Sequence, residues 1–250
     1  MFNFFAEQDA RQGDYFYISG SDYNHIRNVL RMKTGEELLV SCGGVSSLCR
    51  LDGFEGDSAV AEIIKENYQS TDLPVEIYLF QGLPKADKME LIIQKAVELG
   101  VHAIIPTEMS RCVVKLDDKK KKSKTQRWQT IAESAAKQSK RSAVPTVYDA
   151  VSYKEALSMA EKLDVLMVPY ESKDGMESTK RALDNIKVGS KVGIIIGPEG
   201  GFEESEVEKA MAVGGESVSL GKRILRTETA AITAVGMVML HSEMNLGGDE

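Results

Sequence analysis

From residue 75 to the end of the chain, short runs of apolar and β-branched residues alternate with longer stretches of helical periodicity. Strands separated by helices pair in parallel, and a parallel sheet needs helices on both faces to bury it. We therefore expect an α/β domain over residues 73–250. The predicted strands span 75–81, 101–106, 165–169, 192–196 and 217–220, with a short extended segment at 146–148, and the predicted helices span 85–99, 125–140, 152–163, 176–185, 203–213 and 228–244.

Residues 1–72 show a different pattern, in which short strand-like runs are separated by closely spaced glycines. Short strands with glycine turns are typical of a small β-barrel. The predicted strands span 2–6, 15–19, 38–42, 47–54 and 58–65, with one inserted helix at 22–30. The polar segment Thr71–Pro74 is the predicted linker, because proline ends the element before it.

The overall composition excludes several classes of protein. No apolar run reaches the length of a membrane span, and the N-terminus lacks the pattern of a signal peptide, so we expect a cytoplasmic protein that does not bind membranes. The three cysteines and three histidines show neither disulfide nor metal-ligand spacing. We therefore expect no metal.

Charge is unevenly distributed along the chain. The net charge is −7, yet residues 85–141 contain fourteen Lys and Arg against seven Asp and Glu, a local net charge of +7. A basic segment within an acidic protein can form a surface that contacts phosphates, although a solvated helix face gives the same composition.

The segment Ile194–Phe202 contains a predicted strand that ends in the sequence Gly-Pro-Glu-Gly-Gly. Its small residues allow a ligand to approach the backbone closely. The segment lacks the Lys-Ser/Thr of a phosphate-binding P-loop and the glycine spacing of a dinucleotide fingerprint. Glu199 also disfavours an anion, so a neutral ring or a ligand with positive character fits better. The alternative is an ordinary strand-to-helix turn.

The segment Leu220–Ala230 is a second loop between a strand and a helix. Gly221 permits close backbone approach, several cations follow it, and Thr227 is a predicted cap of the last helix. The alternative is a basic surface loop before a packed helix. Two such loops after nearby strands predict one pocket at the carboxyl edge of the sheet.

Other basic residues are candidates for RNA contact. His25 and Arg31 belong to the helix predicted in the first domain, which could instead only plug the barrel. Lys137 and Arg141 share a predicted helix face, where they could contact sugar and phosphate. Arg111 precedes the lysine run Lys119–Lys124, which we interpret as a mobile solvated loop, with non-specific attraction of phosphates as the alternative.

Taken together, these segments resemble the bacterial 16S rRNA (uracil-N3)-methyltransferase family, a member of the SPOUT class. The resemblance rests on the Ile196–Phe202 and Leu220–Ala230 motifs in this order, and it extends over nearly the whole chain. The additional segments that fit the family pattern are His25–Arg31, Lys95–Gly100, and Arg127-Trp128 through Gln138-Ser139 with Arg141.

The resemblance implies an N-terminal PUA-like barrel and a C-terminal SPOUT domain whose chain forms a deep trefoil knot. It implies that S-adenosylmethionine binds in the knot and that the protein is a homodimer. It also implies methylation of N3 of a uridine in the decoding region of 16S rRNA, with the small ribosomal subunit as partner.

The position of Arg226 and Glu199 in the two motif loops suggests a role for each of them. Arg226 is the predicted group that stabilises charge on the uracil, and Glu199 is predicted to orient the base or accept a proton through water. The remaining predicted cofactor-binding residues are Val168, Pro169, Tyr170, Gly197, Pro198, Gly201, Leu220, Gly221, Arg223, Ile224, Leu225 and Thr229.

Two alternatives remain open from the sequence. A SPOUT enzyme acting on another RNA, such as tRNA, would share the pocket and differ in substrate. A non-catalytic RNA-binding protein of the same fold would share the barrel and would not bind S-adenosylmethionine.

Overall fold

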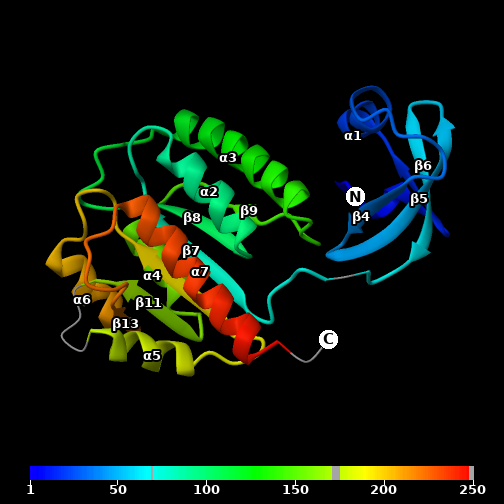
Figure 1. Cartoon of the computed structure of the whole chain (residues 1–250). Coiled ribbons are helices and arrows are strands. Elements are labelled where there is room, and N and C mark those ends of the chain that lie inside the picture. Colours follow the sequence, from blue (N-terminus) through cyan, green and yellow to red (C-terminus); the bar gives the residue numbers. More distant parts are fainter. Residues whose placement is uncertain (69, 171–174, 248–250) are drawn as a thin grey trace. The chain divides into compact units, whose positions relative to one another are not determined.

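The computed structural model describes residues 1–68, 70–170 and 175–247 (Figure 1). The chain divides into two compact units. The first comprises Met1–Asp72 with Ala136–Val144, and the second comprises Leu73–Ala135 with Pro145–Glu250.

The first unit is built on a curled six-stranded sheet with the strand order β1-β4-β5-β6-β3-β2. Among the described strands of this sheet, β1 and β4 pair in parallel and the others pair antiparallel. Apolar side chains such as Phe4, Leu38 and Leu51 fill the core of the unit. The β-rich pattern predicted for this region is confirmed, and the short strand β2 adds to it. The strands are β1 Asn3–Phe5, β2 Arg11–Gln12, β3 Tyr15–Ile18, β4 Glu37–Cys42, β5 Val45–Glu55 and β6 Ser58–Lys65, with a single 3-10 turn at Gln8–Ala10.

The helix predicted at 22–30 is present but irregular. Helix α1, Gly20–Asn24, continues directly into a π-helical turn, His25–Val29. The turn is closed by the backbone N–H of Leu30, which donates to the carbonyl of His25 at 2.9 Å. Ile26 is fully buried in the core, and Arg31 then adopts a left-handed conformation with φ of 53°.

The second unit contains the predicted parallel sheet, with the strand order β10-β8-β7-β12-β11-β13 and β9 paired with β8. Every pairing in it is parallel. The carboxyl ends of β7, β12 and β11 therefore lie side by side at one edge. The strands are β7 Glu76–Gly82, β8 Ala103–Glu108, β9 Thr146–Val147, β10 Val151–Ser152, β11 Val165–Pro169, β12 Lys191–Ile196 and β13 Gly215–Val218.

Strand β12 is central because both of its faces are covered. Ile194 and Ile195 are fully buried. At Gly193, a Cβ atom would lie 2.7 Å from Cδ1 of Leu163 and 2.8 Å from Cδ1 of Leu166, so a larger residue would require these side chains to shift. The three consecutive isoleucines thus form a two-sided buried strand, as parallel sheets require.

The helices pack around this sheet. Helix α2 packs against α7, and α7 packs against β7 and β12, whereas α5 and α6 pack against β13. None of the helices within the described residues is both long and apolar enough to cross a lipid bilayer. The helices are α2 Lys88–Glu98, α3 Asp118–Gln138, α4 Tyr153–Ala160, α5 Met176–Asp184, α6 Glu204–Ala212 and α7 Thr227–Asn245.

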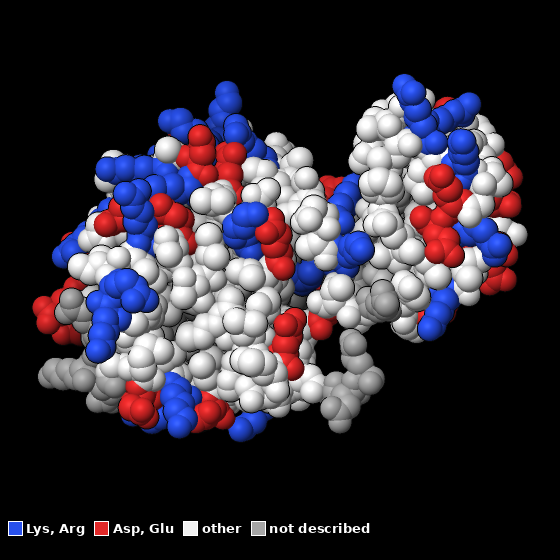
Figure 2. Space-filling view, in the orientation of Figure 1, with Lys and Arg blue, Asp and Glu red and all other residues white. Residues whose placement is uncertain are grey.

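The interpretation of Lys119–Lys124 as a mobile loop is wrong, because these residues form the first turns of α3. Asp117 caps the helix by accepting a hydrogen bond of 2.8 Å from the backbone N–H of Lys120. The ammonium of Lys120 lies 3.1 Å from the same carboxylate, and that of Lys121 lies 3.2 Å from Glu108. Figure 2 shows Lys and Arg side chains gathered over this edge of the second unit.

Candidate active site

A cavity of about 520 Å³ lies where strands β11 and β12 end and helix α7 begins. It therefore occupies the position that the sequence predicts, at the carboxyl edge of the parallel sheet. Its lining residues are Lys88, Pro169, Tyr170, Ile196, Gly197, Pro198, Glu199, Gly201, Phe202, Ile224, Leu225, Arg226, Thr227 and Ala230.

The loop after β12 is pressed against the end of β7. A Cβ atom on Gly82 would lie 2.7 Å from both the backbone nitrogen and the Cδ atom of Pro198. Real Cβ atoms do not approach this closely, so the contact between these two segments requires glycine at position 82. Gly201 has a φ of 70°, a left-handed conformation that glycine adopts without strain.

The Thr227 hydroxyl connects three segments of the site. It donates to the carbonyl of Gly197 at 2.7 Å and accepts from Nε2 of Gln81 at 3.0 Å. Gln81 is fully buried and also donates to the carbonyl of Gly82 at 2.9 Å. These hydrogen bonds tie together the end of β7, the loop after β12 and the start of α7.

Glu199 is held by groups from the start of α2. Its Oε1 accepts from the backbone N–H of Lys85 at 3.0 Å and lies 3.1 Å from Nζ of Lys88. Burial raises the pKa of the Glu199 carboxyl, but the Lys85 N–H and the Lys88 ammonium more than offset this, so its pKa lies below the ordinary value. Glu199 is therefore an ionised, fixed carboxylate.

Lys88 bridges two loops of the cavity. Besides Glu199, its Nζ lies 3.3 Å from Oε2 of Glu228 in the first turn of α7. The hydrogen bond to Glu199, aided by Glu228, raises the pKa of Lys88 above its ordinary value. The ammonium thus stays charged at neutral pH and links the start of α2 to both motifs.

Arg226 differs from the other charged residues of the cavity. It is the N-cap residue of α7, and its side chain is exposed. Within the described part of the chain, its guanidinium has neither a hydrogen bond nor an ion pair. It is therefore the cation that remains available to a ligand. The prediction that Thr227 caps α7 is wrong, because Thr227 is the first helical residue and its hydroxyl bonds to Gly197.

Apolar groups cover other parts of the cavity. The rings of Tyr170 and Phe202 meet edge to face, with centroids 6.2 Å apart. Ile224 is fully exposed although it lines the cavity. An aliphatic side chain held in solvent beside an aromatic pair is suited to covering a planar ligand.

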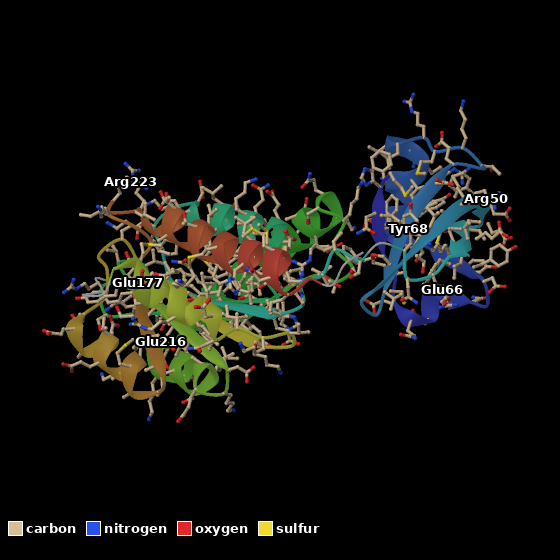
Figure 3. All side chains as sticks on the ribbon, turned by 60° about the horizontal axis from the view of Figure 1, so that its bottom comes forward. Arg50, Glu66, Tyr68, Glu177, Glu216 and Arg223 are labelled. Carbon is tan, nitrogen blue, oxygen red and sulfur yellow. The ribbon has the colours of Figure 1, made fainter. Side chains whose placement is uncertain are left out.

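The structure brings most of the predicted cofactor-binding residues together in the cavity wall. Of those outside the wall, Val168 is fully buried within β11. Arg223 points away from the ribbon, as Figure 3 shows. The remaining predicted residues outside the wall are Leu220, Gly221 and Thr229.

The predicted RNA-binding residues lie in varied surroundings. Arg111 donates to the carbonyl of Gly200 at 3.0 Å and so braces the loop after β12. In the first unit, Nζ of Lys137 lies 2.8 Å from Oδ1 of Asp22. Nε of the buried Arg141 lies 3.5 Å from Oδ1 of Asp72. His25 and Arg31 are exposed. Contact of Lys137 or Arg141 with RNA would require these ion pairs to open.

Lys88 and Gln81 are site residues that the sequence did not predict. Both lie around the end of β7, which was not counted among the strand ends that form the pocket. The Gly82–Pro84 turn after that strand is the signal that could have found them. Among the described residues, no group of three or more His, Cys, Asp and Glu is arranged to hold a metal ion.

Comparison with known protein families shows the class of protein to which this chain belongs. Residues 71–239 match the family model of the RNA methyltransferase domain, and residues 18–50 match that of the RNA methyltransferase PUA domain.

Individual relatives then define the family more narrowly. The chain is 41% identical to ribosomal RNA small subunit methyltransferase E of Bacillus subtilis over 98% of this chain and 97% of the relative. It is 34% identical to the protein of the same name from Mesomycoplasma hyopneumoniae, over 93% of this chain and 96% of the relative. The chain therefore belongs to the ribosomal RNA small subunit methyltransferase E family, as its motifs indicate.

Solved structures agree in fold. The Neisseria gonorrhoeae ribosomal RNA small subunit methyltransferase E bound to S-adenosylmethionine is 32% identical, with a TM-score of 0.81 over 96% of this chain and 97% of that chain. A putative methyltransferase from Legionella pneumophila, also in complex with S-adenosylmethionine, is 29% identical, with a TM-score of 0.80 over 96% of this chain and 97% of that one. The expected α/β fold with a PUA domain is confirmed, and the trefoil knot stays a prediction.

We predict that Thr227→Val destabilises the protein, because it leaves the Gln81 amide and the Gly197 carbonyl without their partner. The expected loss in free energy of unfolding is about 1–3 kcal/mol. Urea unfolding measures it, and Thr229→Val, at an exposed position of the same helix, is the matched control. Equal stability of the two variants would contradict the role of the Thr227 hydroxyl.

We predict a pH-dependent contribution of Glu199 to stability. Because its folded pKa is lowered, the ionised carboxylate stabilises the folded state above its unfolded pKa of about 4.3 and loses this effect as the pH falls through the folded value. Glu199→Gln should therefore be less stable than the wild type at pH 7, with the difference shrinking below about pH 4.3. Denaturant unfolding across this range tests it, and a difference that stays constant with pH would refute it.

Proposed function

We propose that this chain transfers a methyl group from S-adenosylmethionine to N3 of one uridine in the decoding region of the 16S rRNA of the small ribosomal subunit. The observation that carries the proposal is the cavity formed by the two motif loops, with Arg226 as its unpaired cation. Membership of the family and the cofactor bound in two related structures support the same reaction.

The cavity suits the cofactor in size and chemistry. Its volume of about 520 Å³ lies within the range of sites for ligands of this size. The loop backbone at Gly197 and Gly201 can approach the adenosine closely, while Ile224 and Leu225 can cover the adenine ring. The cofactor supplies a methyl group already activated by its sulfonium, so the reaction needs no metal.

The protein has to position the uracil and assist loss of its N3 proton, since a neutral imide nitrogen is a poor nucleophile. Arg226 is free to donate hydrogen bonds to the uracil, where negative charge develops as the proton leaves. Glu199 is fixed as a carboxylate by Lys85 and Lys88. We assign it to orienting the loop and the base, because a lowered pKa makes it a weak proton acceptor.

The target base has to leave its stack to reach a pocket of this kind. Contacts elsewhere on the RNA offset the energy of unstacking. The basic start of α3 and the PUA domain are the parts of the chain that we assign to these contacts. The exposed His25 and Arg31 belong to the PUA domain.

We further propose that the protein forms a homodimer through α7. An apolar groove of about 620 Å³ runs along this helix, between Leu99 of α2 and Leu183 of α5. Leu240 and Met244 at its border are 51% and 72% exposed. An apolar patch that is left open on a helix marks a protein interface.

The decisive test is nucleoside mass spectrometry of rRNA from a strain that lacks this protein. We expect 3-methyluridine to be absent from 16S rRNA and to return when the purified protein and S-adenosylmethionine are added to the small subunits. Retention of the modified base in the deletion strain would refute the proposed substrate. Failure to bind S-adenosylmethionine in calorimetry would instead favour a non-catalytic RNA-binding protein.

We predict that Arg226→Ala lowers the rate of methyl transfer by roughly 10²- to 10³-fold, as loss of one preorganised donor does in other enzymes. Affinity for S-adenosylmethionine should change little, because in the proposed site the loop backbone, and not Arg226, would hold the cofactor. Single-turnover methylation and calorimetry separate the two effects. Lys222→Ala, at an exposed position of the same loop, is the control. A full rate in Arg226→Ala would show that another group stabilises the uracil.

A further inference from the structure

In the first unit, the guanidinium of Arg27 rests on two aromatic rings. Its Cζ lies 5.1 Å from the ring centroid of Phe54 and 5.6 Å from that of Tyr23. Its Nη1 also donates to the Tyr23 hydroxyl. The two rings meet edge to face, with centroids 6.1 Å apart. The guanidinium is thus held in place by cation–π contacts rather than by a carboxylate.

In the platform formed by Tyr23, Arg27 and Phe54, the two rings contact the core and the guanidinium faces solvent. Tyr23 and Phe54 are half-buried and pack against the core of the first unit, whereas Arg27 is exposed. Two other exposed arginines of this unit are paired with carboxylates, Arg11 with Glu66 and Arg50 with Glu62. Among the described residues, Arg27 has no carboxylate partner and its side chain is exposed, so no ion pair neutralises its charge.

The backbone that carries Arg27 is irregular. Arg27 is the central residue of the π-helical turn His25–Val29, and Arg31 follows in a left-handed conformation. π-helical turns are rare and occur frequently at functional sites, because they turn side chains away from the regular helical positions. Here the turn buries Ile26 while Arg27 lies over the two rings.

The residues around the platform favour stacking with a base over contact with a phosphate. Glu55 and Asp57 are exposed on either side of Gly56 in the hairpin that follows Phe54, and the Tyr23 hydroxyl donates to the Gly56 carbonyl at 3.5 Å. Carboxylates in a turn that the platform contacts disfavour a phosphate. The flat face of a guanidinium on aromatic rings is instead suited to stacking with an unpaired base. Stacking uses the planar surface and needs no negative charge.

We infer that Tyr23, Arg27 and Phe54 form a stacking platform for an unpaired base of the RNA substrate, away from the uridine that is methylated. The inference rests on the proposed function for the identity of the RNA. The match of residues 18–50 to the RNA methyltransferase PUA domain covers Tyr23 and Arg27. The platform would help to position the RNA and would take no part in methyl transfer.

The test compares Arg27→Lys and Arg27→Ala in the full-length protein. Arg27→Lys keeps the charge and removes the planar group, so stacking predicts that both variants lose affinity. The probe is a fluorescent, unmodified transcript of small-subunit rRNA, and its dissociation constant is measured by anisotropy. We expect an increase of roughly 5- to 150-fold for Arg27→Ala, the range found when a stacking partner is replaced. Affinity for S-adenosylmethionine should stay unchanged.

Salt dependence separates stacking from phosphate contact. A phosphate contact predicts that Arg27→Lys binds like the wild type and that Arg27→Ala reduces the slope of log affinity against log salt by about one. That outcome would overturn the stacking platform. Arg50→Lys and Arg50→Ala are the matched controls, since Arg50 is an exposed arginine of β5 in the same unit (Figure 3).

Other outcomes also decide the question. Wild-type affinity in both Arg27 variants overturns the inference, as does a defect that appears only with assembled subunits, which would indicate a ribosomal protein as partner. If the wild type binds the transcript without methylating assembled subunits, the proposed function fails, while the Arg27 comparison still decides the platform. If the wild type does not bind RNA, both fail.

Discussion

The site depends on the Thr227 hydroxyl, which accepts a hydrogen bond from the buried Gln81 amide and donates one to the Gly197 carbonyl. Parallel strands bring their carboxyl ends to the same edge of a sheet, but this arrangement does not set the spacing of the loops that follow. The Thr227 hydroxyl does so for three segments at once. The absence of a Cβ atom at Gly82 allows the same segments to approach within contact distance.

Charge organises the site in a second way. Lys88 is shared by Glu199 and Glu228, so both motif loops are attached to the start of α2 by one ammonium group. This pairing leaves Arg226 as the cation without a partner among the described side chains of the cavity. In the proposed reaction, which brings a sulfonium and a uracil together, the fixed carboxylate of Glu199 and the unpaired guanidinium of Arg226 have separate roles.

Much of the architecture could be predicted from local patterns. The run Ile194–Ile196 could only be a buried strand, and the glycines after it predicted an open loop. Predictions from local sequence patterns failed where contacts with residues distant in the chain determine the structure. The lysine run is helical, and it is stabilised there by Asp117, which accepts from the backbone N–H of Lys120, and by Glu108, which pairs with Lys121. Lys137 and Arg141 appeared free in the sequence but meet Asp22 and Asp72.

By itself, the sequence determined the alternation of strands and helices, the β-rich first region, the two motif loops and the family. These follow from periodicity and from residues close together in the chain. Only the tertiary structure decided that Gln81 and Lys88 belong to the site, that Arg226 stays unpaired and that Arg27 lies on Tyr23 and Phe54. Each of these depends on contacts between residues that lie on different elements, or on an irregular turn such as His25–Val29, and helical periodicity encodes neither.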